Sequence, residues 1–207
     1  MLAISDDAPG LSDRQRDVLD AALALLVDGG DGLTMTGVAR RASCSKETLY
    51  KWFGDREGLL TATVQWQAAK VRMVPVDRET IDMQALSIAL EKFARDLLGV
   101  LAGDISVALN RLAVSHAGQE KRNLGKIVLE NGRYAMGRRL KPVLDAGHDA
   151  GLLVIEDSEE AFRTFFGLVV RDVQIRLLLG DRMDLSETVI ARDARRAREQ
   201  FLALHGA

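Results

Sequence analysis

The sequence has little cysteine or proline and no long apolar run, and each shortage excludes a class of protein. One cysteine in 207 residues cannot form an internal disulfide. Only three prolines and 47% hydrophobic residues are typical of a helix-rich chain with a buried core. No run approaches the ~18 apolar residues of a membrane span, and residues 1–10 lack the features of a signal peptide. We therefore expect a cytoplasmic protein without membrane contact.

Motifs for catalysis and cofactor binding are also missing. The sequence contains no H-E-x-x-H, P-loop or G-x-G-x-x-G motif. The three histidines, His116, His148 and His205, are far apart on separate expected helices, so they do not predict a shared metal site. We expect no enzyme activity, no cofactor and no metal site.

The charge is uneven along the chain. The formal net charge is −2, which argues against a protein that is basic over its whole surface. Residues 34–56 nevertheless carry five basic side chains against two acidic ones, a local charge of +3. A basic patch on a mildly acidic body is typical of a protein that meets nucleic acid at one face.

Residues 45–53 predict the short helix around which the chain is organised. Ser45 is a good N-cap, because its hydroxyl can accept hydrogen bonds from the free N–H groups of the first turn. Leu49 and Phe53 are four residues apart and share an apolar face. The other faces carry Lys46, Thr48, Tyr50, Lys51 and Trp52. This combination favours a helix that lies in a DNA groove.

Residues 34–42 predict a second short helix directly before it. Thr34 can cap this helix, and its apolar residues have the spacing of a buried stripe. Only Ser43 and Cys44 separate the helices, so they must cross steeply, as in a helix-turn-helix. The second helix would enter the major groove with its N-terminal residues at the base edges. We interpret Cys44 as a small buried hydrophobe rather than a redox sensor.

With these residues in view, 32–60 (GLTMTGVARRASCSKETLYKWFGDREGLL) resembles the DNA-binding domain of the TetR family of bacterial transcriptional regulators. The matching positions are Thr34, Thr36, Val38-Ala39, Arg41-Ala42, Ser45, Thr48-Leu49-Tyr50, Phe53, Arg56-Glu57 and Leu59-Leu60. Two positions depart from the family pattern. Ser43 replaces the usual Gly, which predicts a non-glycine residue in an unfavourable backbone region. Trp52 often corresponds to His, although an indole N–H can still donate to a phosphate.

Apolar spacing predicts helices along the rest of the chain. The expected ranges are 12–27, 56–74, 83–102, 105–116, 120–149, 157–178 and 184–204. We expect the helix from Arg56 to about Val74, capped by Asp55 and stopped by Pro75, to link the two functional parts mechanically. The helix at 120–149 is expected to be mostly solvated, with Gly125, Gly132 and Gly137 allowing either bending or close packing. The helix at 157–178 is apolar nearly all round, which predicts cover by a second subunit.

The resulting fold class is all-α, with a three-helix helix-turn-helix domain at 1–56 and a helical effector-binding and dimerisation domain at 57–207. The resemblance implies a homodimer through the last two helices, about 158–204. A twofold dimer predicts a palindromic operator in double-stranded DNA, and the apolar interior favours a small, mostly apolar effector. Our hypothesis is a repressor that such a ligand releases from the operator, because the single helix at 56–74 joins the two parts. Two other classes stay open: an architectural DNA-binding protein without effector, and a helical ligand-binding or enzymatic domain with a vestigial helix-turn-helix.

The predicted DNA-binding residues fall into two groups beside the capping Ser45. Lys46 and Thr48 are expected at base edges because they lie in the first turn of the recognition helix. Phosphate contacts are expected from Thr36, Tyr50, Lys51, Trp52 and Arg56. The alternatives are a helix-end hydrogen bond for Thr36, a solvated charge for Lys51, and partial burial for Tyr50 and Trp52.

A ligand cavity in the second domain is the remaining prediction. Its candidate lining residues are Trp66, Phe93, Arg111, Tyr134, Phe165 and Phe166. Ordinary core packing is the alternative for each aromatic residue. Arg111 is the best polar candidate, because it lies among apolar residues, and its alternative is a side chain that points to solvent.

Overall fold

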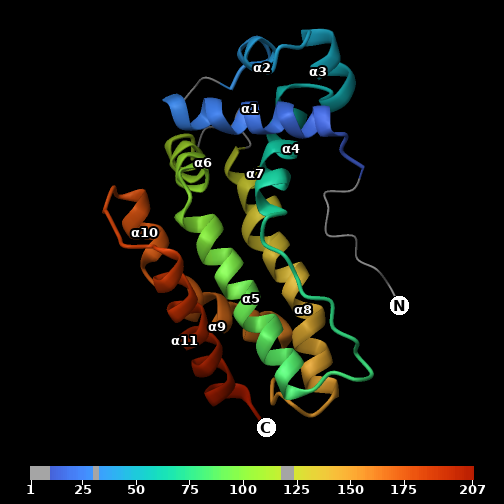
Figure 1. The fold of residues 1–207 in the computed structure, drawn as a ribbon, viewed down its shortest axis with the longest axis vertical. Helices are drawn as coiled ribbons and strands as arrows, with labels where there is room; N and C mark the ends of the chain where they lie inside the picture. The colour runs from blue at the N-terminus through green and yellow to red at the C-terminus, as the bar shows by residue number, and fades with distance from the viewer. Residues whose placement is uncertain (1–9, 30–32, 118–123) are drawn as a thin grey trace. The chain divides into compact units, whose positions relative to one another are not determined.

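The computed structural model describes residues 10–29, 33–117 and 124–207. Every regular element in these ranges is a helix (Figure 1). The β structure there is limited to one antiparallel bridge between Leu153 and Gly206. The expected all-α class is confirmed. Residues 1–9, Gly30 after the first helix and the expected helix start at Glu120 lie outside the described residues.

The described residues pack into two compact units. The first unit contains the described parts of 7–70 and 103–134, and the second contains 71–102 and 135–207. This division by packing differs from the functional division after residue 56, which stays a prediction. No single helix in the described ranges is long and apolar enough to cross a membrane; α5 and α6, defined below, meet that test only as a pair broken at Gly103.

The first unit is built around its longest helix. Its elements are α1 (Asp13–Gly29), α2 (Met35–Arg41), α3 (Lys46–Phe53), α4 (Arg56–Ala68), α6 (Asp104–Ser115), α7 (Leu124–Val128) and the π-helical turn η2 (Leu129–Arg133). Helix α1 packs against α2, α4 and α6. A capping box starts α1, because Ser12 N–H donates to Gln15 Oε1 at 2.8 Å and Gln15 N–H donates to Ser12 Oγ at 3.3 Å.

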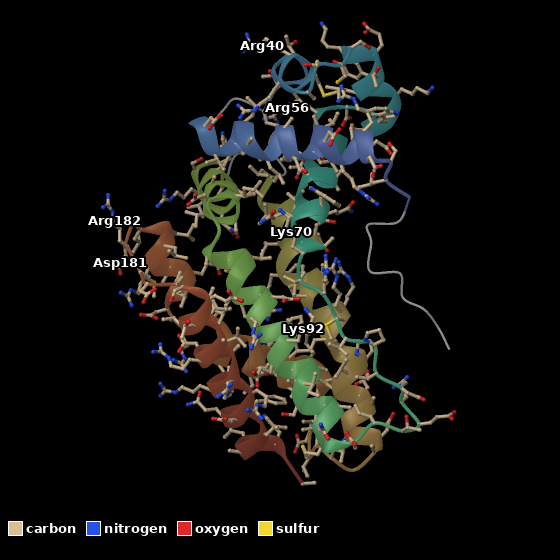
Figure 2. The ribbon with its side chains drawn as sticks, viewed as in Figure 1. Arg40, Arg56, Lys70, Lys92, Asp181 and Arg182 are labelled. Atoms are coloured by element: carbon tan, nitrogen blue, oxygen red, sulfur yellow. The ribbon has the colours of Figure 1, made fainter. Side chains whose placement is uncertain are left out.

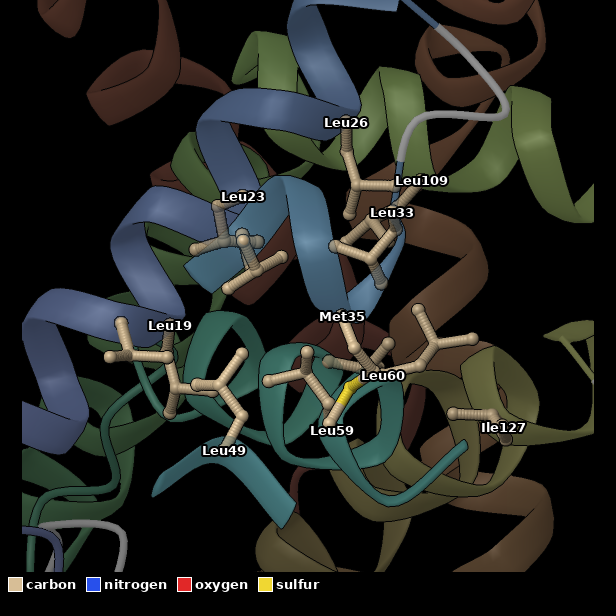
Figure 3. Close-up of a cluster of buried hydrophobic side chains, with 14 of the residues drawn as sticks. Leu19, Leu23, Leu26, Leu33, Met35, Leu49, Leu59, Leu60, Leu109 and Ile127 are labelled. Atoms are coloured by element: carbon tan, nitrogen blue, oxygen red, sulfur yellow. The ribbon is translucent and has the colours of Figure 1, made fainter. Parts of the chain in front are cut away.

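Leucine side chains from separate helices form the core of the first unit (Figure 3). The labelled residues are Leu19, Leu23, Leu26, Leu33, Met35, Leu49, Leu59, Leu60, Leu109 and Ile127. Leu49 is the buried residue of α3, and it is fully covered. Burial of one such side chain contributes about 1.5–3 kcal/mol. The core therefore attaches the short α3 to α1 and α4.

Helix α4 begins as predicted but is much shorter than predicted. Asp55 Oδ1 accepts a hydrogen bond from Gly58 N–H at 2.8 Å, which confirms the cap. The helix ends at Ala68 rather than near Val74. Beyond this end, side chains from other helices form hydrogen bonds with the backbone groups of Val71 and Arg72. Arg139 Nη1 donates to Val71 O at 3.2 Å. Asp96 Oδ2 accepts from Arg72 N–H at 3.1 Å. The prediction of one long linking helix is therefore wrong.

Phenylalanine rings form the centre of the second unit. Its elements are α5 (Met83–Ala102), α8 (Tyr134–Asp149, whose first residue belongs to the first unit), α9 (Ser158–Val170), α10 (Val173–Leu178) and α11 (Glu187–His205). Helix α11 packs against α5 and α9. The Phe165 ring centroid lies 6.3 Å from that of Phe93 and 5.1 Å from that of Phe201, and all three side chains are fully buried. These rings join α5, α9 and α11 in one core.

The helix predicted at 120–149 differs from the structure in two ways. The described part is divided into α7, η2 and α8, and α8 is largely buried on one face rather than mostly solvated. Close packing explains Gly137, because a Cβ there would lie 2.9 Å from Cε1 of the buried Phe162. At Gly125 and Gly132 a Cβ would meet no atom within 4 Å, so packing does not explain those glycines.

The helix predicted at 157–178 is divided at Arg171, which has a φ of 46°. Its predicted cap is confirmed, because the Asp157 carboxylate accepts from Glu159 N–H at 3.2 Å and Glu160 N–H at 3.1 Å. These two N–H groups hold the pKa of the Asp157 carboxyl below its ordinary value. The last helix starts at Glu187, three residues after the predicted Asp184, whose Oδ1 instead accepts from Ser186 N–H at 3.0 Å.

The close approach at Gly137 predicts an unusual response to Gly137→Ala. In an exposed helix this substitution is stabilising, but here the new methyl group would overlap the buried Phe162 ring. We expect Gly137→Ala to lower the free energy of unfolding by about 1–3 kcal/mol. The matched control is Gly99→Ala in α5, where the Cβ position is open and a gain of up to about 1 kcal/mol is expected. Urea unfolding of both variants measures the difference, and equal effects would contradict the packing argument.

Candidate nucleic-acid interface

Helices α2 and α3 have the boundaries and caps that the sequence predicts. Thr34 Oγ1 accepts a hydrogen bond from Gly37 N–H at 3.0 Å, and Ser45 Oγ accepts from Thr48 N–H at 3.1 Å. Each cap satisfies one of the free N–H groups in the first turn of its helix. The two short helices are therefore fixed at their starts by interactions between residues three apart.

The turn between α2 and α3 is held by two backbone hydrogen bonds. Cys44 N–H donates to Ala39 O at 2.9 Å, and Ser43 N–H donates to Arg40 O at 3.3 Å. This is the Schellman pattern, which needs a left-handed residue just after the helix. Ser43 occupies that position with a φ of 50°, which confirms the expected unfavourable backbone conformation. Cys44 is partly buried against the core of the first unit, as a small hydrophobe would be.

A side chain from α1 closes the same turn. Arg14 Nη2 donates to Ala42 O at 2.5 Å and to Ser43 O at 2.9 Å. Sequence analysis missed Arg14, because no local pattern links the first turn of α1 to carbonyl groups 28 and 29 residues later.

The predicted DNA-contact residues come together on α2, α3 and the start of α4. Lys46, Tyr50 and Lys51 are exposed on α3, and so is Thr36 on α2. The Tyr50 side chain leaves 51% of its residue surface open to solvent. The remaining two α3 side chains are half-buried: the Thr48 hydroxyl lies 3.1 Å from Ser45 Oγ, and the Trp52 ring packs edge-on against Phe53.

One basic side chain of this surface is neutralised by an ion pair, and a second is bonded to the backbone. Arg41 Nη1 forms an ion pair with Asp28 Oδ2 at 2.6 Å, and Arg56 Nε donates to Leu33 O at 2.8 Å. Both residues therefore help to hold the fold. Arg40 is exposed at α2, and Figure 2 labels it together with Arg56. The exposed cations of α2 and α3 other than the paired Arg41 are Arg40, Lys46 and Lys51.

Glu47 adds a negative charge to the first turn of α3. Its own backbone N–H, followed by the Ser45 hydroxyl, holds the pKa of the Glu47 carboxyl below its ordinary value. The carboxylate is therefore ionised at neutral pH, beside Lys46. A negative charge in the first turn also complements the helix dipole.

The predicted ligand-binding residues are divided between the two units. Trp66, Arg111 and Tyr134 belong to the first unit; Phe93, Phe165 and Phe166 belong to the second. Trp66 Nε1 donates to Asp20 Oδ1 at 2.8 Å, so this residue takes part in packing α4 against α1. Phe93 and Phe165 lie in the core of the second unit, whereas Arg111 and Tyr134 are exposed. An open hollow between α3 and α4 contains none of the six; it is lined by Trp52, Phe53, Asp55, Glu57, Gly58, Thr61, Ala62 and Gln65.

Two capped helices joined by a tight turn, with exposed polar and basic side chains on the second helix, define a helix-turn-helix DNA-binding protein. Family comparisons name the group. Residues 18–63 match the family described as bacterial regulatory proteins, tetR family, and residues 88–207 match the AefR-like transcriptional repressor, C-terminal domain. The chain belongs to the TetR family of bacterial transcriptional regulators. Members of this family are regulators rather than enzymes, as expected from the missing catalytic motifs.

Solved structures and curated relatives agree with this assignment. A TetR transcriptional regulator from Agrobacterium tumefaciens is 47% identical, with a TM-score of 0.80 over 95% of this chain and 96% of that one. The flavonoid-responsive regulator FrrA is 29% identical, with a TM-score of 0.68 over 93% of this chain and 97% of that one. The HTH-type transcriptional regulator Mb2274c of Mycobacterium bovis is 32% identical over 103 residues, 47% of this chain and 53% of the relative. The chain therefore spans about half the length of the curated relatives it matches.

The left-handed Ser43 predicts that Ser43→Gly stabilises the protein. Glycine removes a strain of about 1–2 kcal/mol but loses about 0.5–1 kcal/mol of additional chain entropy on folding. We expect a net gain of roughly 0.5 kcal/mol in the free energy of unfolding. Urea unfolding measures it, with Ser43→Ala, which keeps the strain, as the control. A loss of stability in Ser43→Gly would show that the turn is not strained at this residue.

Proposed function

We propose that this protein is a homodimeric repressor that binds a palindromic operator in the cytoplasm and is released by a small, mostly apolar ligand. The observation that carries the proposal is α3, a capped helix anchored by Leu49 with Lys46, Tyr50 and Lys51 exposed. The description of the matched C-terminal family as AefR-like repressors supports repression.

The contact assignment follows from position on the helices. Lys46 and Thr48 lie in the first turn of α3 and are proposed to read base edges. Thr36, Tyr50, Lys51, Trp52 and Arg56 are proposed to contact phosphates. Of these, Lys51 is the cleanest phosphate candidate, because Arg56 also bonds to Leu33 O.

The proposed dimer uses the last helices, about 158–204. Apolar side chains on α10 and α11 support this location, because Ile175 is 54% exposed and Leu204 is 64% exposed. Leu179, directly after α10, is 81% exposed. A second copy could cover these groups, and a twofold dimer presents two recognition helices to a palindromic site.

Coupling to a ligand needs a route other than the single long helix that the sequence predicts. The contact between α4 and η2 offers one. Gln65 Nε2 donates to Asn131 Oδ1 at 2.9 Å, and Asn131 Nδ2 donates to Ile127 O at 2.9 Å. π-Turns inside helices are frequent at functional sites. The name of the relative FrrA, flavonoid-responsive regulator, supports an aromatic, largely apolar effector class.

The experiment that tests the proposal is selection of binding sites from a random DNA duplex pool with the full chain. An enriched palindrome is expected. Weak, salt-sensitive binding without enrichment would instead favour the architectural alternative. No binding at low salt would reject the DNA-binding function of this chain.

The two contact classes predict different effects of Lys46→Ala and Lys51→Ala on the selected operator. Loss of a base contact at Lys46 should relax sequence preference, with a cost of about 1–3 kcal/mol confined to one base position. Loss of a phosphate contact at Lys51 should weaken binding to all sequences evenly and reduce the salt slope by about 1. Fluorescence anisotropy against salt measures both effects. Identical effects of the two variants would reject the assignment.

Ligand release predicts that a bound effector lowers operator affinity. A panel of flavonoids is the first probe, with binding measured by calorimetry and operator affinity measured at saturation. A ligand can shift the DNA-binding equilibrium only by its differential affinity for the two states. Tight binding that leaves operator affinity unchanged would reject release by that ligand.

A further inference from the structure

We infer that Arg14 is a positioning residue for DNA recognition: its guanidinium fixes the turn between α2 and α3 and thereby the direction of α3. Arg14 lies in the first turn of α1, and Nη2 reaches Ala42 O and Ser43 O at 2.5 and 2.9 Å. The inference rests on DNA binding by α3 and assigns Arg14 no contact with DNA.

The hydrogen bonds of the turn show why it needs this side chain. The two backbone bonds of the Schellman pattern use the carbonyl groups of Ala39 and Arg40. The carbonyl groups of Ala42 and Ser43 take no part in those two bonds, and both accept a hydrogen bond from Arg14. A cation is also favoured at the C-terminal, negative end of α2. Nη2 carries two N–H groups, so this one nitrogen can donate to both carbonyl oxygens.

Ser43 makes the turn dependent on outside support. A serine in the left-handed region is less stable there than the glycine that such turns usually contain. The bond from Arg14 to Ser43 O acts on that same residue. Without Arg14 the turn is freer to leave this conformation, and the two turn residues set the angle at which α3 begins.

A phosphate contact by Arg14 is the competing explanation, because 47% of its side chain is exposed and Arg is a frequent phosphate ligand. The two roles differ in salt dependence. A phosphate contact releases counterions and acts on all DNA sequences. A positioning residue alters the fit of α3 to base edges, so it affects the operator more than non-operator DNA.

The test uses the full chain with the variants Arg14→Ala and Arg14→Lys. Affinities for the operator and for a scrambled duplex are measured over a series of salt concentrations. For Arg14→Ala we expect about a tenfold weaker operator affinity, the size of one lost charge-assisted contact. Scrambled-duplex affinity and the salt slope should stay the same, and Arg14→Lys should give an intermediate loss. The matched control Asp17→Asn, whose carboxylate lies 3.7 Å from Arg14, leaves both carbonyl contacts in place and should bind like the wild type.

A double-mutant cycle with Ser43→Gly tests the route through the turn. Glycine accepts the left-handed conformation unaided, so Arg14→Ala should cost several-fold less operator affinity in that background than in the wild type. If Arg14→Ala alone unfolds, the same cycle is measured with Arg14→Lys. Equal losses in both backgrounds would overturn the inference, and so would a salt slope lowered by about 1 with equal loss on the scrambled duplex.

Hydrogen exchange without DNA separates this inference from the proposed function. Arg14→Ala should speed amide exchange at residues 43–48 and leave most of α4 unchanged. Unchanged exchange at 43–48 would overturn the inference even where the operator is known. Failure of the wild-type protein to bind any DNA would reject the proposed function, while the exchange result would still decide whether Arg14 holds the turn.

Discussion

Burial of Leu49 beneath α3 is the interaction on which the DNA-binding surface depends. An eight-residue helix is too short to be stable alone in water, whatever its propensity. The fully buried Leu49 attaches α3 to the leucine core of α1 and α4. With one face fixed in this way, Lys46, Tyr50 and Lys51 are exposed on the others. The geometry of recognition is therefore a consequence of core packing rather than of the polar residues themselves.

Helix starts with a side-chain cap could be predicted from the sequence, whereas several helix ends could not. The caps at Thr34, Ser45, Asp55 and Asp157 were predictable because each bonds to a residue two or three positions on. The end of α4 depends on Asp96 and Arg139, which lie 24 and 68 residues from the backbone groups they bind. The break between α9 and α10 lies at Arg171, so no glycine or proline at that position predicts it. Sequence patterns therefore predict hydrogen bonds between residues that are close in the chain. Hydrogen bonds to distant residues are seen only in the folded structure.

The candidate site shows the same limit in its charges and its aromatic residues. The position of every predicted DNA-contact residue on α2, α3 or the start of α4 followed from spacing, but the partners of the cations did not. Arg41 pairs with Asp28, which lies outside residues 34–56, so a count of charges within that range overstates the positive charge available to DNA. Arg56 keeps its charge, but its guanidinium also bonds to Leu33 O. Aromatic residues were ambiguous in another way. An apolar aromatic residue such as Phe93 or Phe165 can line a ligand cavity or fill a core, and the sequence does not distinguish these two roles. In the structure both side chains are fully buried.

The early end of α4 changes how a regulatory signal could reach the DNA-binding helices. A continuous rigid helix would transmit any displacement directly, whereas α4 ends at Ala68 and is bonded to the π-turn through Gln65 and Asn131. A π-turn contains one residue more than an α-turn needs, so conversion to α-helix would rotate the helix that follows it by about 100°. Such a change is discrete rather than gradual. Under the proposed function, α4, which packs against α7 and η2, would respond to such a change as a two-state element.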